Sequence, residues 1–286
     1  MRGDIKMTDI NLGAGCEYSN IFFEKLKQIK DHGKQRLFII ADFDHSLTTP
    51  DSDTCWGIIE QSGILPEEYV RQHQQAFEHY LQIERDSSQM SWEQKNDLMS
   101  QWFLRMIDLL MEFEFHQEMI SQIFEVKKIH FRPEVLSFLK LTKTMNIPLI
   151  IVSAGLSDMI TYCLSLEQCL FDNIMIIANC FDFNDQQLLT GFKQKNLIHT
   201  FNKDRQVINL EILQKIQSRH NLVLIGDLIP DSKMSESFVH QIAIKVGFYN
   251  NPDTLQVEDY LKHFDLVIKD DASFTEIIKL LGWLTI

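Results

Sequence analysis

The chain has 286 residues, of which 45% are hydrophobic and 23% are charged. This composition is typical of a folded globular protein, and the length favours two domains, or one large domain with an insertion. The formal net charge of −13 argues against sequence-independent binding of nucleic-acid polymers or anionic membranes. No apolar run reaches the ~18–20 residues that a membrane-spanning helix needs. We therefore expect neither a nucleic acid nor a membrane as a partner.

The N-terminus and the cysteines indicate the compartment. The first residues, Met1 to Lys6, lack the apolar segment of a secretion signal. The five cysteines are odd in number and contain no CxxC spacing, a pattern that fits a reducing compartment better than a disulfide framework or a zinc site. We therefore expect a cytoplasmic protein, either a monomer or a weak dimer.

Short apolar runs rich in Ile, Val and Leu predict the buried strands of a parallel sheet. In chain order they are Leu37 to Ala41, Leu149 to Val152, Ile174 to Ala178, Leu222 to Ile225, Ile242 to Val246 and Leu266 to Ile268. Helical patterns lie between most of them, for example over residues 133–145 and 158–167. This alternation of strand and helix predicts an α/β fold with a doubly wound, Rossmann-like sheet.

One long segment has no strand pattern. It contains two or three amphipathic helix patterns, over residues 67–84 and 91–128, and the second begins with Ser91 followed three residues later by Gln94, a capping-box pattern. An all-helical insertion after the first strand is typical of a separate cap over the sheet. We predict a catalytic core formed by residues 1–55 and 129–286 and a helical cap, expected to set substrate specificity, over residues 56–128.

Acidic and hydroxyl side chains follow three of the predicted strands. Asp42 and Asp44 follow the first strand, Ser153 ends the second, and Asp227 and Asp231 follow the fourth. One acid at a strand end is most often a turn or capping residue, but two adjacent unit charges repel by ~4 kcal/mol at an effective dielectric constant near 20. A bound divalent cation would remove that repulsion, and Mg²⁺ suits one or two carboxylates together with a substrate phosphate.

These residues lie in motifs that resemble a known superfamily. Asp42-Phe-Asp-His-Ser-Leu-Thr resembles the Asp-x-Asp-x-(Thr/Ser)-Leu-(Thr/Ser) signature of haloacid dehalogenase (HAD) superfamily phosphatases, and Ser153, Lys203 and Gly226-Asp227-x-x-x-Asp231 resemble the other three motifs. From about residue 37 to 269 the chain also resembles the cytosolic pyrimidine 5′-nucleotidase (5′-nucleotidase III) family. The matching stretches are Ser153-Ala-Gly-Leu-Ser-Asp, Asp182-Phe-Asn-Asp, Gly191-Phe-Lys, Leu197-Ile-His-Thr-Phe-Asn-Lys and Leu224-Ile-Gly-Asp.

The resemblance implies roles for the acids. Asp42 would attack phosphorus as a nucleophile and form an aspartyl-phosphate. Asp44 would protonate the leaving group and later deprotonate the attacking water. Mg²⁺ would bind the side chains of Asp42 and Asp227 and the backbone carbonyl of Asp44, with Asp231 close by.

The resemblance also implies a phosphate site. Ser153 and the backbone amides around Ala154 and Gly155 would hold phosphate oxygens, and Lys203 would neutralise the remaining charge. Considered alone, Lys203 would be interpreted as a solvated surface lysine and Ser153 as a helix N-cap. The ten histidines show no metal-ligand spacing, so we interpret them as surface or packing residues.

Substrate choice is expected to lie in the cap. By resemblance, Glu84 would meet the base or the sugar, and Trp102 and Phe103 would lie near the base. The loop after the first motif is about five residues shorter than in the family, and Pro50 stands where the family has an aromatic residue that stacks on the base. That departure leaves both the base preference and the substrate class open.

Three functions are therefore considered. The first is an Mg²⁺-dependent 5′-nucleotidase that hydrolyses nucleoside 5′-monophosphates, with pyrimidine nucleotides favoured. The second keeps the fold and the chemistry but acts on another small phosphomonoester, such as a sugar phosphate or a phosphorylated metabolite. The third, a binding protein without catalysis, is the least favoured because the set of motif residues is complete.

Overall fold

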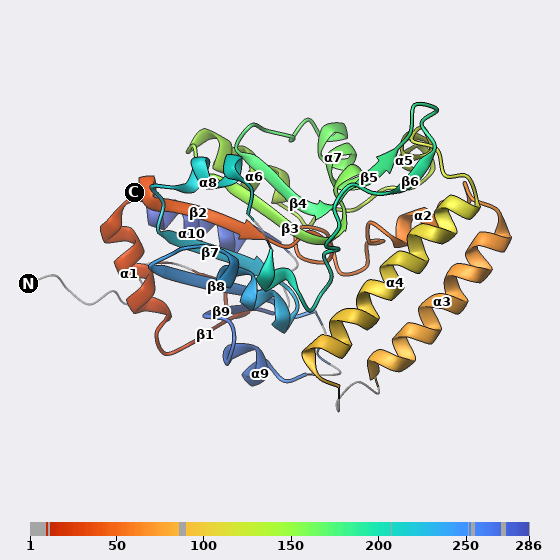
Figure 1. The fold of residues 1–286 in the computed structure, drawn as a ribbon. Coiled ribbons are helices and arrows are strands. Elements are labelled where there is room, and N and C mark those ends of the chain that lie inside the picture. The colour runs from red at the N-terminus through yellow and green to blue at the C-terminus, as the bar shows by residue number, and fades with distance from the viewer. Residues whose placement is uncertain are drawn as a thin grey trace, which may run out of the picture.

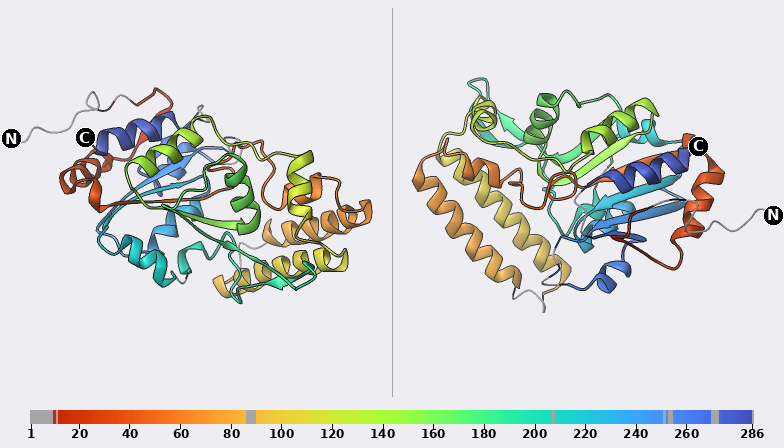
Figure 2. Two further views of the ribbon diagram at one scale, coloured as in Figure 1. Left: turned by 90° about the horizontal axis from the view of Figure 1, so that it is seen from above. Right: turned by 180° about the vertical axis from the view of Figure 1, so that it is seen from behind.

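A computed structural model gives the fold of the chain (Figure 1). It describes residues 10, 12–85, 90–206, 208–250, 252, 255–269 and 273–285, and the side chains of residues 81–85 also lie outside the description. Within these ranges a central sheet is covered by helices on both faces, and two long helices stand beyond one end of the sheet (Figures 1 and 2). The α/β class and the helical cap expected from the sequence are confirmed.

The main sheet has seven strands in the order β1-β9-β8-β7-β2-β3-β4, and all neighbours are parallel except β1 and β9. The strands are β1 (Cys16–Tyr18), β2 (Leu37–Ala41), β3 (Leu149–Leu156), β4 (Ile174–Asn179), β7 (Asn221–Gly226), β8 (Ile242–Phe248) and β9 (Leu266–Ile268). All six predicted strands are present. The sequence did not predict β1, whose three residues are too short to show a periodic pattern.

Burial on both faces explains why the strands are continuous apolar runs. In β2, Phe38 and Ile40 pack on one side, against helices α8 (Leu210–Ile216) and α9 (Val257–Leu261). Ile39 packs on the other side, because successive side chains of a strand point to opposite faces. The helices of that second side are α1 (Phe22–His32), α6 (Val135–Thr144), α7 (Ser157–Leu166) and α10 (Thr275–Thr285).

The cap contains four helices from consecutive sequence, and its long pair α3 and α4 lies side by side (Figures 1 and 2). Ser91 caps α4, and the predicted capping box with Gln94 is present. The pattern over residues 91–128 is not one helix, because α4 ends at Glu112 and Glu114 adopts a left-handed conformation with φ of 52°. The helices are α2 (Gly57–Gln61), α3 (Glu67–Arg85), α4 (Trp92–Glu112) and α5 (Met119–Val126). The exact domain boundaries at residues 55 and 129 stay a prediction.

A small hairpin connects the core to the cap. It consists of β5 (Phe181–Phe183) and β6 (Leu189–Phe192), which pair antiparallel and lie along α4 (Figure 1). The rings of Phe181 and Phe192 both pack edge-on against Trp56 at the start of α2. The sequence did not predict this hairpin, which forms a second support for the cap besides the chain connections.

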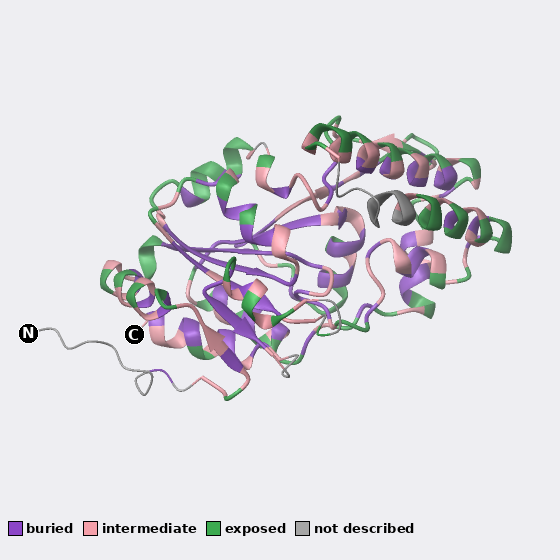
Figure 3. Cartoon of the chain, turned by 90° about the horizontal axis from the view of Figure 1, so that it is seen from below, coloured by how far each residue is buried: buried purple, intermediate pink, exposed green. Residues whose placement is uncertain are grey.

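Burial follows this layered plan (Figure 3). Buried residues are concentrated in the strands and on the inward sides of the helices, whereas the outer turns of the cap helices are exposed. In the described part of the chain, no helix combines the length and the apolar character needed to cross a membrane.

Candidate active site

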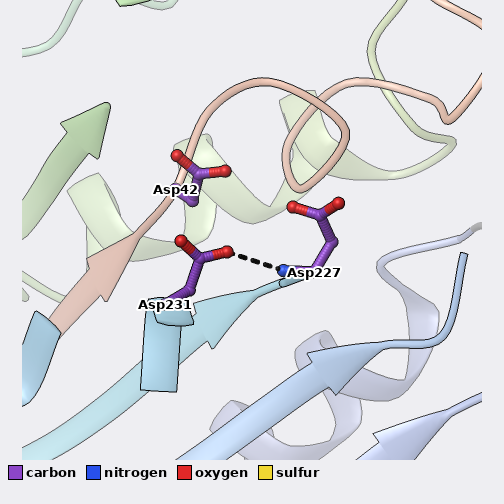
Figure 4. A group of neighbouring side chains, drawn as sticks. All are labelled: Asp42, Asp227 and Asp231. Carbon is purple, nitrogen blue, oxygen red and sulfur yellow. Dashed lines mark hydrogen bonds between the residues drawn. The ribbon is translucent and has the colours of Figure 1, made fainter. Parts of the chain in front are cut away.

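Three acidic residues meet at the carboxyl end of the sheet (Figure 4). Asp42 follows β2 and Asp227 follows β7, and these strands are parallel neighbours whose ends pair Ala41 with Ile225. Asp231 returns to the same place from the 3₁₀ segment η5 (Ile229–Ser237). The pairing of the two strands therefore brings together motif residues that lie 185 positions apart in the sequence.

The three carboxylates form a compact buried cluster. Each offers an oxygen within 4.8 Å of the others, and Asp42, Asp227 and Asp231 are 4%, 3% and 0% exposed. Burial raises the pKa of Asp227 to about 6, and the nearby Asp231 adds to the rise. Burial also raises the pKa of Asp42 well above its ordinary value, which Lys203 opposes and the two other acids reinforce. Cations are therefore needed for all three groups to be ionised together.

Lys203 supplies one of those cations. Its Nζ lies 2.6 Å from Oδ1 of Asp42 and 2.8 Å from Oδ1 of Asp231. Burial alone lowers the pKa of Lys203, but the carboxylates of Asp231 and Asp42 outweigh it and raise the pKa above the ordinary value of lysine. Because the side chain is only 5% exposed, Lys203 is a buried member of this cluster and not a solvated surface residue.

Asp231 accepts three hydrogen bonds, whereas Asp42 and Asp227 accept two each and line the cavity, which Asp231 does not. Oδ2 of Asp231 accepts a hydrogen bond of 3.2 Å from the backbone N–H of Asp227 (Figure 4). It also accepts one of 2.9 Å from the backbone N–H of Leu228, while Oδ1 accepts a hydrogen bond from Nζ of Lys203. This close approach requires glycine at position 226, where a Cβ atom would lie 2.5 Å from Cβ of Asp231. The geometry thus favours Asp42 and Asp227 as direct ligands and Asp231 as the residue that positions Lys203.

Asp44 lies beside the cluster with a different environment. Its Oδ1 accepts a hydrogen bond of 3.0 Å from the backbone N–H of Cys55, and burial raises its pKa above the ordinary value of an aspartate. A raised pKa favours the protonated form that a general acid needs. A Cβ atom at position 155 would lie 2.9 Å from Oδ2 of Asp44. Residue 155 of the second motif must therefore be glycine.

The second motif is part of a strand. Ser153 lies within β3, is 1% exposed, and accepts a hydrogen bond of 2.9 Å from the backbone N–H of Gly155. Helix α7 begins after Leu156 and has no side-chain cap, so the interpretation of Ser153 as a helix N-cap is wrong. Ser153, Ala154 and Gly155 line the same cavity as Asp42.

A buried arginine supports the loop of the first motif, and no motif in the sequence indicated it. Arg132 donates to the carbonyl oxygens of Ser46 and His45, at 2.9 and 2.6 Å, and to Oδ1 of Asn250. Asn250 in turn donates to Oδ2 of Asp227 at 3.2 Å. His45 has a φ of 60°, so this network holds a left-handed turn directly after Asp44.

A cavity of about 770 Å³ runs from the acidic cluster into the cap. Trp102 and Phe103, predicted near the substrate, line it, and so does Pro50. Trp56 lines it as well, so an aromatic ring is present although Pro50 replaces the family's aromatic residue. The side chain of Glu84 lies outside the described residues, and its role stays a prediction from the sequence.

Two histidines line the cavity, His45 and His73. The interpretation of the histidines as surface or packing residues stays a prediction. His73 is 5% exposed on α3 and lies next to Glu60 of α2. Glu60 and His73 reach the cavity only because α2 packs against α3, so no linear motif could have indicated either residue.

Helix α4 of the cap also contacts the segment that carries Lys203. Trp92 at the start of α4 donates from its indole N–H to the carbonyl of Phe201 at 3.2 Å, and the guanidinium of Arg205 lies 3.7 Å from the centre of its ring. Asn96 contacts a ring nitrogen of His199 at 3.1 Å. We call these contacts of residues 92, 96, 199, 201 and 205 the α4 latch.

Comparison with known proteins agrees with this geometry. The family model described as "Pyrimidine 5′-nucleotidase (UMPH-1)" matches residues 45–285. A 7-methylguanosine phosphate-specific 5′-nucleotidase A of Xenopus laevis is 30% identical over 270 residues, which are 92% of each chain. The human 7-methylguanosine phosphate-specific 5′-nucleotidase is 29% identical over 260 residues, covering 88% of this chain and 86% of the relative.

Solved structures show the same fold. A crystal structure of cytosolic 5′-nucleotidase IIIB bound to cytidine superposes with a TM-score of 0.84 at 25% identity, covering 98% of this chain and 97% of that one. A probable phosphoserine phosphatase from Vibrio cholerae shares the fold, with a TM-score of 0.57 at 17% identity over 87% of this chain and 64% of that one. The chain therefore belongs to the pyrimidine 5′-nucleotidase family and is a phosphomonoester hydrolase of the 5′-nucleotidase class.

Proposed function

We propose that the protein is a cytosolic, Mg²⁺-dependent 5′-nucleotidase that hydrolyses pyrimidine nucleoside 5′-monophosphates through an aspartyl-phosphate. The observation that carries this proposal is the buried cluster of Asp42, Asp227, Asp231 and Lys203, which opens into a cavity with aromatic walls. A phosphate bound at the cluster would place the attached nucleoside in that cavity. The name "cytosolic 5′-nucleotidase" of a structural neighbour supports the compartment.

In the first half of the reaction, an oxygen of Asp42 attacks phosphorus and the bond to the 5′ oxygen of the nucleoside breaks. Asp44 gives its proton to that departing oxygen, which a raised pKa favours. In the second half, the now ionised Asp44 takes a proton from water, the water oxygen attacks phosphorus, and the bond to Asp42 breaks. Phosphate leaves and both acids return to their starting states.

The donor set suits Mg²⁺. Asp42 and Asp227 are buried carboxylates that line the cavity, and hard oxygen ligands of this kind are what Mg²⁺ prefers. We propose that these two side chains and the backbone carbonyl of Asp44 hold the ion, with Asp231 behind them. Bound there, the ion would offset the charge of the acids and of the phosphate and so favour attack by an anionic nucleophile.

We propose that Lys203, Ser153 and the backbone amides of Ala154 and Gly155 hold the phosphate oxygens. Lys203 reaches this position as a fixed charge, because two carboxylates orient its ammonium group. Ser153 lies within β3, two residues after Ile151, which pairs with Ala41 next to Asp42. Donors held in place in this way stabilise the charge that develops on the transferring phosphoryl group.

For the base, we propose contact with Trp102 and Phe103, together with Trp56, which the cavity adds to the sequence prediction. The ring of Tyr80 is stacked on the ring of Trp102, with 5.8 Å between the ring centroids. Aromatic faces accept any base by stacking. Pyrimidine nucleotides are favoured by the name of the matching family, and 7-methylguanosine monophosphate is the second candidate because of the names of the curated relatives.

The test is phosphate release with Mg²⁺ over a panel of monophosphates. The panel contains UMP, CMP, dTMP, AMP, GMP, 7-methyl-GMP, sugar phosphates and p-nitrophenyl phosphate. We expect higher kcat/KM for pyrimidine nucleotides than for unmodified purine nucleotides. A clear preference for 7-methyl-GMP would favour the second candidate, and activity only on sugar phosphates or the synthetic ester would contradict both.

A further inference from the structure

The chain just after β8 reaches the active site, although it belongs to none of the four sequence motifs. Strands β7 and β8 are parallel neighbours whose ends pair Gly226 with Gly247. Residues 249–250 therefore leave the sheet at the same edge as Asp227, which follows Gly226. The second of them, Asn250, is half-buried and lines the same cavity as Asp227.

Every polar atom of the Asn250 side chain has a partner. Oδ1 accepts a hydrogen bond of 2.8 Å from Arg132. Nδ2 donates to the backbone carbonyl of His45 at 3.0 Å and to Oδ2 of Asp227 at 3.2 Å. Because a guanidinium can only donate and a carbonyl oxygen can only accept, these contacts fix which end of the amide faces Asp227. That end carries only N–H donors, so Asn250 acts on a metal site through Asp227 and not as a ligand.

Asp227 is held from several sides at once. Its Oδ1 accepts a hydrogen bond of 2.9 Å from the hydroxyl of Ser46, so with Asn250 both carboxylate oxygens have a donor. Its backbone carbonyl accepts a hydrogen bond of 2.8 Å from the buried hydroxyl of Tyr260, and its backbone N–H donates to Asp231. The carboxylate group therefore has a defined orientation that rotation about its side-chain bonds would break.

Arg132 gives Asn250 a rigid support. The arginine is 2% exposed, and its guanidinium lies 3.9 Å from the centre of the Phe248 ring at the end of β8. The same guanidinium donates to the backbone carbonyls of Ser46 and His45. Since the arginine is fixed by these contacts, it fixes the amide, and the amide in turn fixes one oxygen of Asp227.

We propose that Asn250, supported by Arg132, is a positioning residue that orients the Asp227 carboxylate so that the metal site selects Mg²⁺ over Ca²⁺. This proposal rests on the Mg²⁺ site proposed above and adds the device that sets its selectivity. Mg²⁺ demands near-octahedral geometry, whereas the larger Ca²⁺ accepts more ligands in a flexible arrangement, including both oxygens of one carboxylate. Donors on each oxygen of Asp227 oppose the rotation that a two-oxygen contact with Ca²⁺ would need.

Metal binding tests the proposal without requiring turnover. Calorimetric titration of the full chain with Mg²⁺ and with Ca²⁺ would compare the wild type with Asn250→Leu, which keeps the approximate shape of the side chain and removes its hydrogen bonds. We expect the Kd for Mg²⁺ to rise about tenfold, as is typical when a partner that orients a metal ligand is lost. The Kd for Ca²⁺ should rise about twofold or less, because Ca²⁺ tolerates a less ordered carboxylate.

Asn173→Leu is the matched control. Asn173 is also a buried asparagine whose amide donates twice, to Oγ1 of Thr142 at 3.2 Å and to the carbonyl of Ile147 at 2.8 Å. It lies just before β4, at the opposite end of the sheet, and does not line the cavity. A loss of general stability should appear in the thermal melt of this control, while its Kd values for both ions should equal those of the wild type.

The ratio of the two Kd values separates positioning from a merely structural role. Equal losses for both ions, or unchanged binding of Mg²⁺ in a folded Asn250→Leu variant, would overturn the role of Asn250, and so would a wild type that binds Ca²⁺ as tightly as Mg²⁺. Should Asn250→Leu fail to fold, Asn250→Ala, which adds no bulk, decides by the same ratio.

The outcome for the nucleotidase function is separate. A wild type that binds neither ion would overturn both the Mg²⁺ site and the role of Asn250. Selective binding of Mg²⁺ that Asn250→Leu reduces, without release of phosphate from any nucleotide, would overturn the proposed nucleotidase function and leave the role of Asn250 standing.

Discussion

At the catalytic end of the cavity the carboxylates are held by the protein itself. Lys203, Ser46 and Asn250 bond to oxygens of Asp42 and Asp227, and Asp231 uses both of its oxygens. At the cap end, by contrast, the side-chain nitrogen atoms of His73, Trp56 and Trp102 have no hydrogen-bond partner among the described residues. If the proposed function holds, the chemistry is pre-organised before the substrate binds, whereas recognition of the base would be completed only by the substrate.

The difference has a structural origin. The catalytic residues lie on loops at the ends of paired strands, where the ladder of β2 and β7 fixes their separation. The cap residues lie on helices α2, α3 and α4, whose mutual packing decides which side chains face the cavity. Substitutions at the two ends should therefore act on different kinetic constants, kcat at one end and KM at the other.

The largest effect is expected from Asp42→Asn, which removes the nucleophile. We expect kcat for nucleotides to fall by at least ~10⁴-fold, because the covalent route is lost. The measurement is phosphate release under saturating Mg²⁺, with a thermal melt to verify folding. Covalently bound phosphate on this variant, detected by mass spectrometry, would rule out Asp42 as the nucleophile.

Asp44→Asn should have the next largest effect, and it should depend on the leaving group. We expect kcat to fall by about 10²–10⁴-fold on a nucleoside monophosphate, which needs a proton on its leaving oxygen. The loss should be much smaller on p-nitrophenyl phosphate, whose leaving group departs as a stable anion. Equal losses on both esters would mean that Asp44 acts through the geometry of the loop and not as an acid.

Acidic pH should weaken Mg²⁺ binding. The raised pKa values of Asp227, about 6, and of Asp42 mean that the metal-free folded protein holds protons there that the unfolded chain would release. This contribution to stability is present at low pH and is lost as the pH rises through about 6. Mg²⁺ should therefore raise Tm at pH 7.5 and raise it less at pH 5.5. If the rise in Tm caused by Mg²⁺ did not change with pH, protons and the metal would not be competing for these carboxylates.

Trp102→Ala tests the aromatic wall of the cap end. Loss of a stacking surface should raise KM for nucleotides about tenfold, since one base stacked on an aromatic side chain contributes ~1–3 kcal/mol. kcat/KM for p-nitrophenyl phosphate should fall much less, because its small ring does not reach as far into the cap. A fall in kcat at constant KM would instead mean that Trp102 supports the catalytic end.

The smallest effect is expected from the α4 latch, which joins the two ends. Arg205→Ala removes the cation from the ring of Trp92, an interaction of ~0.5–1 kcal/mol at an exposed site. We expect kcat/KM to fall by about two- to fivefold, because the segment that carries Lys203 is held less firmly. Arg71→Ala, which removes an exposed ion pair with Glu68 on α3, is the matched control. Equal effects of both substitutions would show that the latch contributes nothing specific.

The sequence predicted the catalytic end almost completely, and there is a physical reason. Three of the four motifs follow a short apolar run, and buried parallel strands are recognisable from such runs alone. The motif of Lys203 does not follow such a run. Once Leu37 to Ala41 and Leu222 to Ile225 are taken as parallel strands, Asp42 and Asp227 must lie at the same edge of the sheet. The contribution of Arg132 and Asn250 was not predicted, because their partners are backbone atoms and a carboxylate far away in the sequence.

For the cap end, the sequence predicted the helices and, by resemblance, the cavity residues Trp102 and Phe103. The amphipathic patterns and the Ser91 capping box are local features. They located α3 and the start of α4 closely, but the pattern over residues 91–128 missed the end of α4 at Glu112. Which side chains face the cavity depends on how α2, α3 and α4 pack against one another and on the unpredicted hairpin β5–β6. For that reason Glu60, His73 and Trp56 had no signal in the sequence, although all three line the cavity.

The amino-acid sequence by itself determined the α/β class, the strands of the core and the order of the motif acids, because these depend on local periodicity and on residues next to strand ends. Only the tertiary structure decided that Lys203 is buried between Asp42 and Asp231, and that Glu60 and His73 meet at the far end of the cavity. Burial and long-range contacts depend on how the elements pack, and no short segment of sequence contains that information.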